Sequence, residues 1–360
     1  MSQSSEYEIR YLTTDDLEQY NALLRYAFQI TEQELYQCGW QDEEIKQSKF
    51  PILERADVIG CFDHNNLVSQ IAVYPLKMNI YGAVYPIGFV TSVCTYPEYT
   101  GRGIMKQLML KSLHHMRQRQ QSLALLFPYS IPLYRKMGWE IVSNKITYTV
   151  KDRQLPAKAS APGIVRRVDW ENEDFRNLHA KFAALTHGCL FRNALAWEEY
   201  WRWDADDTMV AIYYDVNGKP CGYMVYLIKD DVMHIKEMIY LNREAQEGLW
   251  EYIRAHDSMI DEVTGSSYFS DLIAFEIADS FLPWNNRTIS VCFNNGECTL
   301  LESEPSHKVT LSIATLTTLL LGYKTAAKLY KLGRITANEQ TILMLDNALL
   351  HEMPYISDYI

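Results

Sequence analysis

A loop rich in glycine and positive charge lies near residue 100, between a strand-like segment and a helix. An apolar run ends at residues 93–95, and residues 101–106 read Gly-Arg-Gly-Ile-Met-Lys just before an amphipathic helix. A helix N-terminus offers backbone N–H donors without internal partners and the positive end of the helix dipole, so it binds phosphate oxygens well. Glycine lets the backbone approach a phosphate closely, and Arg102 and Lys106 add charge. The pattern predicts a phosphate-binding loop, with a glycine-capped turn and two solvated cations as the alternative.

A tyrosine stands in a second segment, after the next apolar strand. The predicted strand covers residues 123–127, and residues 128–139 then read Pro-Tyr-Ser-Ile-Pro-Leu-Tyr-Arg-Lys-Met-Gly-Trp. Residues 133–137 suit a helical turn, which places Tyr134 on a short helix directly after a buried strand.

Together the two segments resemble the GNAT acyltransferase superfamily. Its acetyl-CoA pyrophosphate loop has the pattern Gln/Arg-x-x-Gly-x-Gly/Ala, and its tyrosine helix reads Tyr-x-x-x-Gly-Phe. Gly103 matches the central glycine of the loop, whereas Thr100 and Met105 depart from the pattern. A large apolar residue at the last loop position resembles one branch, the Eis-like (enhanced intracellular survival) N-acetyltransferases. That branch has a second acetyltransferase lobe without a cofactor loop and then a sterol-carrier-like C-terminal domain.

The resemblance implies acetyl-CoA as the cosubstrate, no metal, and direct attack of an amine on the thioester in a ternary complex. It assigns the backbone of Val93, Cys94 and Thr95 to the pantetheine and the thioester carbonyl, and Tyr134 to protonation of the departing thiolate. A phenol with a pKa of about 10 keeps its proton at neutral pH and can give it to a thiolate whose conjugate acid has a pKa of about 8.5. A packed structural tyrosine is the alternative. The other implied cofactor contacts are Gly101, Arg102, Gly103, Ile104, Met105 and Lys106 at the pyrophosphate, with Tyr129 and Ser130 beyond them.

The base that the resemblance implies is the terminal α-carboxylate, which here belongs to Ile360. Its reference pKa of about 3.3–3.7 makes it anionic at neutral pH, so it would favour cation binding and relay a proton through water. Asp358 is a candidate substrate-binding residue for a cationic amine such as an aminoglycoside or a polyamine. A frayed terminus is the alternative, although residues 354–356 are apolar enough to dock.

The element order predicts an α/β (α+β) fold with tandem GNAT-like mixed sheets, flanking helices and a sterol-carrier-like α/β C-terminal domain. We expect helices at residues 17–27 and 103–119, and strands at 56–62, 67–74 and 85–94. The predicted domains are residues 1–150 for the catalytic GNAT lobe, 151–275 for a second, degenerate lobe, and 276–360 for the sterol-carrier-like part. A Pro/Ala/Lys-rich stretch at residues 155–163 is the expected linker. In the second lobe, residues 238–248 carry acids at the loop's counterpart, which predicts no CoA there.

The composition and the net charge limit the classes of partner that we expect this chain to bind. Of the 360 residues, 48% are hydrophobic and 22% charged, and the net charge is −11, which disfavours a nucleic-acid binder and weakly favours cationic substrates. No signal peptide and no apolar run of about 20 residues is visible, so we expect no membrane insertion and a cytoplasmic location. The seven cysteines form no CxxC pair and no HExxH is present, so we expect reduced thiols and no zinc. The family resemblance suggests a homo-oligomer, with a hexamer as one form.

Two other functions compete with small-amine acetylation. A protein or peptide lysine acetyltransferase would use the same chemistry in a wider cleft. A lipid-binding module would use the sterol-carrier-like part, where Leu319, Leu320, Leu321 and Tyr323 cluster, although such residues more often form core.

Overall fold

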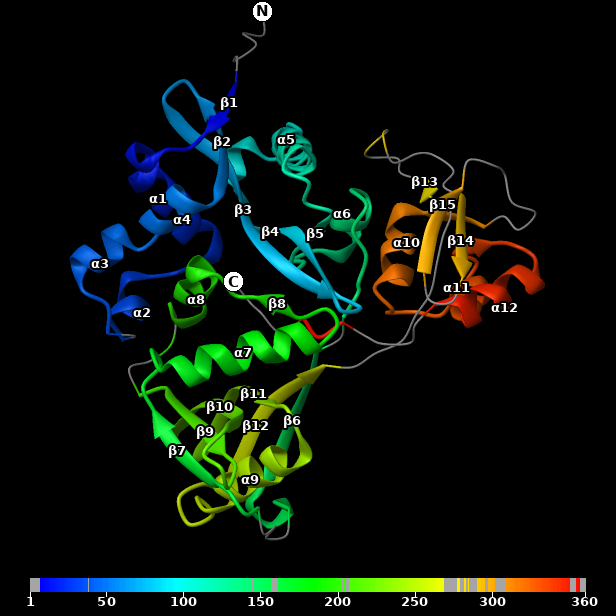
Figure 1. Cartoon of the computed structure of the whole chain (residues 1–360). Helices are drawn as coiled ribbons and strands as arrows, with labels where there is room; N and C mark the ends of the chain where they lie inside the picture. The colour runs from blue at the N-terminus through cyan, green and yellow to red at the C-terminus, as the bar shows by residue number, and fades with distance from the viewer. Residues whose placement is uncertain are drawn as a thin grey trace, which may run out of the picture.

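The chain folds into two lobes, each built on a mixed sheet, and a smaller C-terminal part beside the first lobe (Figure 1). The computed structural model describes residues 7–37, 39–143, 145–156, 161–202, 204, 207–268, 277–278, 282, 284, 290–294, 297–301, 309–349 and 354–356. The predicted α/β class with tandem mixed sheets is confirmed. Within these ranges no helix combines the length and the apolar character needed to cross a bilayer.

The first sheet has the strand order β1-β2-β3-β4-β5, and β8 pairs with the far end of β3. Its strands are β1 (Glu8–Tyr11), β2 (Asp57–Asp63), β3 (Asn66–Ile80), β4 (Ala83–Thr95), β5 (Leu123–Leu125) and β8 (Leu190–Phe191). The pair β4/β5 is parallel and is joined by α5 (Ile104–Gln118), whereas the other described pairs of this sheet are antiparallel. The chain therefore contains the β-α-β order that the sequence predicts.

Both faces of the first sheet are buried. Alternate residues of its strands point to opposite sides, and helices cover each side. On one face α1 (Leu17–Phe28) packs Tyr20, Leu23 and Leu24 against the strands, and on the other face α5 packs Leu108 and Met109. The remaining helices of this lobe are α2 (Glu32–Gln37), α3 (Asp42–Gln47), α4 (Phe50–Arg55) and α6 (Ile131–Arg135).

The second sheet has the order β6-β12-β11-β10-β9-β7. Its strands are β6 (Lys145–Lys151), β7 (Ile164–Val168), β9 (Met209–Tyr214), β10 (Pro220–Lys229), β11 (Val232–Tyr240) and β12 (Glu262–Tyr268). Its helices are α7 (Glu173–Leu185), α8 (Ala194–Trp201) and α9 (Arg243–Arg254). Here too a parallel pair, β11/β12, is joined by a helix, α9, so the second lobe repeats the β4-α5-β5 unit of the first.

The passage between the lobes lies closer to the N-terminus than the expected linker. β6 pairs with β12 in the second sheet, so the chain crosses from one sheet to the other between Val142 and Lys145. The Pro/Ala/Lys-rich stretch of residues 155–163 instead joins β6 to β7 within the second sheet, and its residues 157–160 lie outside the described ranges. The Pro/Ala/Lys-rich composition of residues 155–163 correctly indicates a loop, but it does not reveal that the strands on both sides, β6 and β7, belong to the same sheet.

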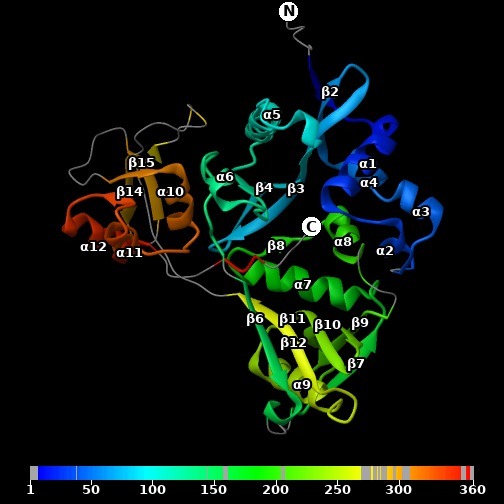
Figure 2. The same cartoon turned by 180° about the vertical axis from the view of Figure 1, so that it is seen from behind.

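The described residues of the C-terminal part form a three-stranded sheet, a hairpin and three helices (Figure 2). The sheet has the order β13 (Ile277–Ala278), β16 (Thr310–Ser312) and β17 (Ile335–Thr336), and the hairpin is β14 (Ser290–Asn294) with β15 (Glu297–Leu301). The helices are α10 (Ile313–Leu320), α11 (Ala326–Lys331) and α12 (Glu339–Ala348). Of the leucine cluster, Leu319 is buried in the core of this part and Leu321 in the core of the first lobe, as the core interpretation predicts, whereas Leu320 is 40% exposed.

Candidate active site

The strands β4 and β5 diverge and leave an open strand edge. They pair only where residues 87–89 meet residues 123–125. β4 then continues to Thr95 while pairing with β3 alone, so no described strand lies along its other edge beyond Phe89. Unpaired backbone N–H and C=O groups on such an edge can bind an extended ligand. Val93, Cys94 and Thr95, to which the family resemblance assigns the thioester, lie on this stretch.

A bulge distorts β4 at the same place. The β3/β4 register shifts between Gln70 and Ala72, and Ser92 has a positive φ of 53°. The buried Tyr20 hydroxyl donates a hydrogen bond to Ser92 Oγ at 2.9 Å. A β-bulge re-aims the backbone groups beside it, so Tyr20 holds the stretch that carries Val93 in a particular orientation. No sequence signal marks this bulge, because Ser92 is neither glycine nor asparagine.

The predicted phosphate loop is exposed and ends at a helix start without a side-chain cap. Gly101 and Gly103 have φ values of 74° and 75°, the left-handed region that favours glycine. Gly103 is the N-cap of α5, and no described side chain caps its N–H groups. The corresponding α9 differs, because the Asn242 side chain accepts a hydrogen bond from its Ala245 N–H. α5 therefore starts without the side-chain acceptor that α9 has, and a helix start of this kind is suited to binding an anion.

The residues around these glycines have separate structural roles. Arg102 is held at the loop by hydrogen bonds to Tyr7 Oη at 2.5 Å and to the Glu98 carbonyl at 2.8 Å. Ile104 is buried in the core, Met105 is half-buried, and Lys106 is exposed in the first helical turn. The loop is thus anchored on one side and open on the other.

Replacing Gly103 by Ala should weaken cofactor binding more than folding. An added Cβ would meet no atom within 4 Å, so the cost to folding is the left-handed φ alone, about 1 kcal/mol. The new methyl would stand where the family resemblance places the pyrophosphate, and losing one such contact should raise the KM for acetyl-CoA about tenfold in steady-state kinetics. Gly218→Ala is the control, since Gly218 has a φ of 76° and open space around it but lies in the second lobe. An equal KM in both variants would contradict the assignment.

Tyr134 lies on α6 and lines an apolar cavity. Its side chain is buried, and its ring contacts the edge of Trp139 with 6.2 Å between centroids. Burial raises the pKa of the Tyr134 phenol, which keeps it protonated. The cavity measures about 300 Å³ and is lined by Tyr134, Trp139, Phe89 from β4, Leu125 from β5 and Ile356 from the C-terminal tail. Tyr129 and Ser130 precede α6, and the Tyr129 side chain is fully exposed.

The C-terminal tail docks between the two lobes at this cavity (Figure 1). The Ser143 hydroxyl donates to the Pro354 carbonyl at 3.0 Å, and the Tyr355 N–H donates to the His187 carbonyl at 2.9 Å. The Tyr355 ring meets Phe182 of α7 edge-on, and Ile356 is buried in the core of the first lobe. The predicted base at Ile360 and the predicted substrate contact Asp358 lie outside the described residues.

A junction of all three parts of the chain holds the tail in place. His187 Nδ1 accepts a hydrogen bond from the Tyr81 N–H at 3.2 Å, and Nε2 contacts the Leu321 carbonyl at 3.1 Å. This pattern suits a neutral imidazole that donates from Nε2. Next to it, Gly188 has a φ of 78°, and a Cβ there would lie 2.0 Å from Pro354 Cβ. The sequence analysis missed His187 and Gly188, because neither stands in a motif and their partners are distant in the chain.

The cysteines near the site are not activated. Burial raises the pKa of the Cys94 thiol to about 12 and that of Cys61 to about 11, so both stay protonated at neutral pH. Among the described residues no group of histidine, cysteine and carboxylate side chains could hold a metal ion. What the site offers is therefore a buried phenol, an open backbone edge and a docked tail.

Comparison with known proteins finds matches to two acetyltransferase domains and a sterol carrier domain. Residues 8–142 match the acetyltransferase (GNAT) domain, residues 188–288 match a second acetyltransferase (GNAT) domain, and residues 266–357 match the sterol carrier protein domain. An uncharacterized N-acetyltransferase of Streptomyces griseus is 20% identical over 274 residues, which are 67% of this chain and 64% of that protein. The chain thus spans less than two thirds of that relative. A mycothiol acetyltransferase of Saccharomonospora viridis is 35% identical over 81 residues, 21% of this chain and 26% of that protein.

Solved structures share the fold over nearly the whole chain. A GCN5-related N-acetyltransferase from Anabaena variabilis superposes with a TM-score of 0.85 and 20% identity, covering 99% of this chain and 100% of that one. A conserved protein from Enterococcus faecalis superposes with a TM-score of 0.85 and 22% identity, covering 98% of this chain and 99% of that one. Eis1 from Mycobacterium abscessus superposes with a TM-score of 0.76 and 18% identity, covering 98% of this chain and 99% of that one.

Proposed function

We propose that this chain, which matches two acetyltransferase (GNAT) domains and a sterol carrier protein domain, is an Eis-like N-acetyltransferase. In this proposal it transfers the acetyl group of acetyl-CoA to a primary amine of a cationic small molecule. The observation that carries the proposal is the shared cavity at the last pair of β4 and β5, where Phe89 and Leu125 line it. That cavity is lined both by Tyr134 and by Ile356 of the docked tail.

Acetyl-CoA binds along the first lobe in this proposal. The pyrophosphate lies at the start of α5, against the backbone N–H groups that follow Gly103 and beside Arg102 and Lys106. The pantetheine runs along the open edge of β4, where backbone groups of Val93 and Cys94 bind it and polarise the thioester carbonyl. The second lobe lacks an equivalent opening for phosphate at α9, because Asn242 caps that helix.

The amine attacks the thioester carbon directly, the C–S bond breaks, and the departing thiolate takes the proton of Tyr134. Burial supports this role, since it keeps the phenol protonated. An intermediate acetyl-cysteine is disfavoured because burial raises the pKa of the Cys94 thiol to about 12. The amine loses its proton to the terminal carboxylate of Ile360, directly or through water, since residues 354–356 bring the tail to the same cavity.

The acceptor is a cationic amine of the aminoglycoside or polyamine kind. The net charge of −11 supports attraction of a cation. Within the cavity the carboxylate of Glu140 is already occupied by two arginines, so recognition of further positive charge is assigned to Asp358 and to the Ile360 carboxylate.

The test is release of the CoA thiol from acetyl-CoA, with mass spectrometry of the acceptor. Kanamycin, spermidine and a lysine peptide serve as three acceptors, and each reaction is compared with acetyl-CoA hydrolysis in their absence. The proposal predicts turnover and a product heavier by one acetyl group with kanamycin or spermidine. Acetylation of the peptide alone would replace the small-amine proposal by the protein acetyltransferase alternative, and no acetylation at all would overturn both.

A further inference from the structure

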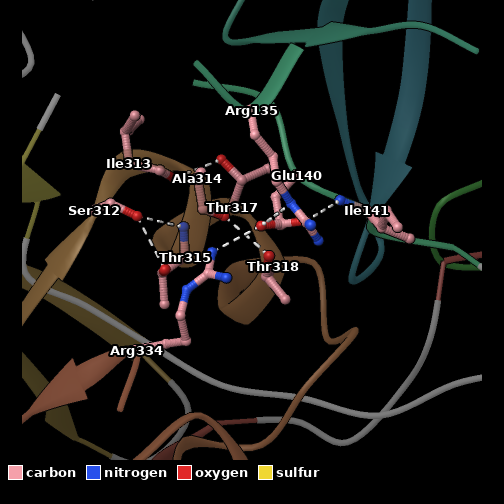
Figure 3. A network of polar contacts seen from close by, with 10 residues as sticks. All are labelled: Arg135, Glu140, Ile141, Ser312, Ile313, Ala314, Thr315, Thr317, Thr318 and Arg334. Atoms are coloured by element: carbon pink, nitrogen blue, oxygen red, sulfur yellow. Dashed lines mark hydrogen bonds and ion pairs between the residues drawn. The ribbon is translucent and has the colours of Figure 1, made fainter. Parts of the chain in front are cut away.

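One buried carboxylate joins the helix of Tyr134 to the C-terminal domain. Figure 3 shows Glu140 between Arg135, the residue after Tyr134 on α6, and Arg334, which precedes β17. Arg135 Nη2 donates to Glu140 Oε1 at 2.6 Å and Arg135 Nε donates to the same oxygen at 2.8 Å. Arg334 Nη2 donates to Glu140 Oε2 at 2.7 Å. Arg135 Nε also donates to Oε2 at 3.0 Å, so Arg135 contacts both oxygens of Glu140 and shares Oε2 with Arg334.

The Glu140 carboxylate is buried and accepts hydrogen bonds on both of its oxygens. Only 6% of its side chain is exposed, and the Ile141 N–H donates to it at 3.0 Å. Burial alone would raise the pKa of Glu140, but the hydrogen bonds from Arg135, Ile141 and Arg334 outweigh it and leave the pKa below its ordinary value. Glu140 is the buried member of the bridge, since the Arg135 and Arg334 side chains are 45% and 41% exposed, so removing one arginine leaves the buried carboxylate with less compensation.

The helix that carries Tyr134 has little support of its own. α6 is five residues long, too short to be stable as an isolated helix, and no described side chain caps its start. Its Ile131 and Leu133 side chains are exposed. Tyr134 packs in a core cluster with Met137, its carbonyl accepts a hydrogen bond from the Trp139 N–H at 3.1 Å, and Arg135 pairs with Glu140. The position of the phenol therefore depends on a carboxylate that the C-terminal domain also holds.

We propose that Glu140 and Arg334 are positioning residues: the C-terminal domain holds α6 through this bridge and so sets the place of the Tyr134 hydroxyl at the thioester sulfur. The inference rests on the proposed function, in which Tyr134 protonates the thiolate. It assigns to the C-terminal domain a part in the acetyl transfer step itself, exerted through Arg334.

The experiment is a double-mutant cycle on the full chain, with kcat and the KM for acetyl-CoA measured for wild type, Arg334→Gln, Tyr134→Phe and the double variant. Arg334→Gln alone should lower kcat about five- to tenfold with an unchanged KM, since a slightly misplaced catalytic group costs rate rather than cofactor binding. In the Tyr134→Phe background the same change should cost nothing, because the group that it displaces is already gone.

Two further variants control for general destabilisation. Arg334→Lys, which keeps the charge, should recover part of the lost kcat. Arg243→Gln breaks an exposed ion pair with Glu247 on α9 and should leave kcat unchanged. If Arg334→Gln lowers kcat by the same factor with and without Tyr134, the inference is wrong while the proposed function stands. If Tyr134→Phe itself leaves turnover intact, the proposed acid fails and the inference falls with it.

Discussion

Replacing Tyr134 by Phe should lower kcat about 100- to 1,000-fold and leave the KM for acetyl-CoA nearly unchanged, because the variant loses only a proton donor. The phenyl ring keeps the packing against Trp139 and the shape of the cavity. The loss should therefore appear in the transfer step, measured as single-turnover release of CoA with saturating acetyl-CoA.

The pH dependence of this effect follows from the burial of the phenol. The pKa of Tyr134 is raised above its ordinary value, so the donating form is fully present at neutral pH and is lost only as the pH rises through that raised pKa. The ratio of wild-type to Tyr134→Phe activity should stay constant up to about pH 10. Tyr148→Phe is the matched control, since burial also raises the pKa of Tyr148, which lies on β6 in the second lobe. A similar loss in both variants would contradict a specific role for Tyr134.

Replacing Gly188 by Ala should lower kcat about 10- to 100-fold by displacing the tail from the cavity. A Cβ at this position would lie 2.0 Å from Pro354 Cβ and 2.1 Å from its Cα, so backbone must move. Residues 354–356 would then lose their place beside Ser143 and His187, and the carboxylate that follows them would lose its place at the amine.

The control for this variant separates displacement from backbone strain. Gly218→Ala imposes the same left-handed φ, 76° against 78°, but its new Cβ meets no atom within 4 Å. That strain should cost each variant about 1 kcal/mol of unfolding free energy, measured by urea denaturation. Gly188→Ala should lose more, because its Cβ also displaces the docked tail, and only Gly188→Ala should lose kcat. Full activity in Gly188→Ala would show that the docked tail has no part in the transfer.

The parts of the site that the sequence predicts are local ones. The glycine loop before α5 and the tyrosine on α6 each depend on a few neighbouring residues, because helix starts and short helices follow from local spacing. Gly103 therefore adopts the positive φ that the loop pattern requires, and Tyr134 lies on a helix after β5, which ends at Leu125, two residues before the predicted end.

The parts that sequence reasoning missed are contacts between residues far apart in the chain. The bulge at Ser92 depends on Tyr20, the tail depends on His187 and Gly188, and Glu140 meets a guanidinium 194 residues away. Residues of these types also occur in ordinary loops and on helix surfaces, so the residue type alone does not reveal the distant partner. β6 shows the same limit for strands, because only the pairing with β12 places it in the second sheet.

The most direct test of the account is the structure of the protein with CoA and a bound amine acceptor. The account predicts CoA along the open edge of β4, the Tyr134 hydroxyl within hydrogen-bond distance of its sulfur, and the Ile360 carboxylate about 3 Å from the amine or one water away. A complex in which that carboxylate lies outside the cavity, with the amine facing other groups, would contradict it.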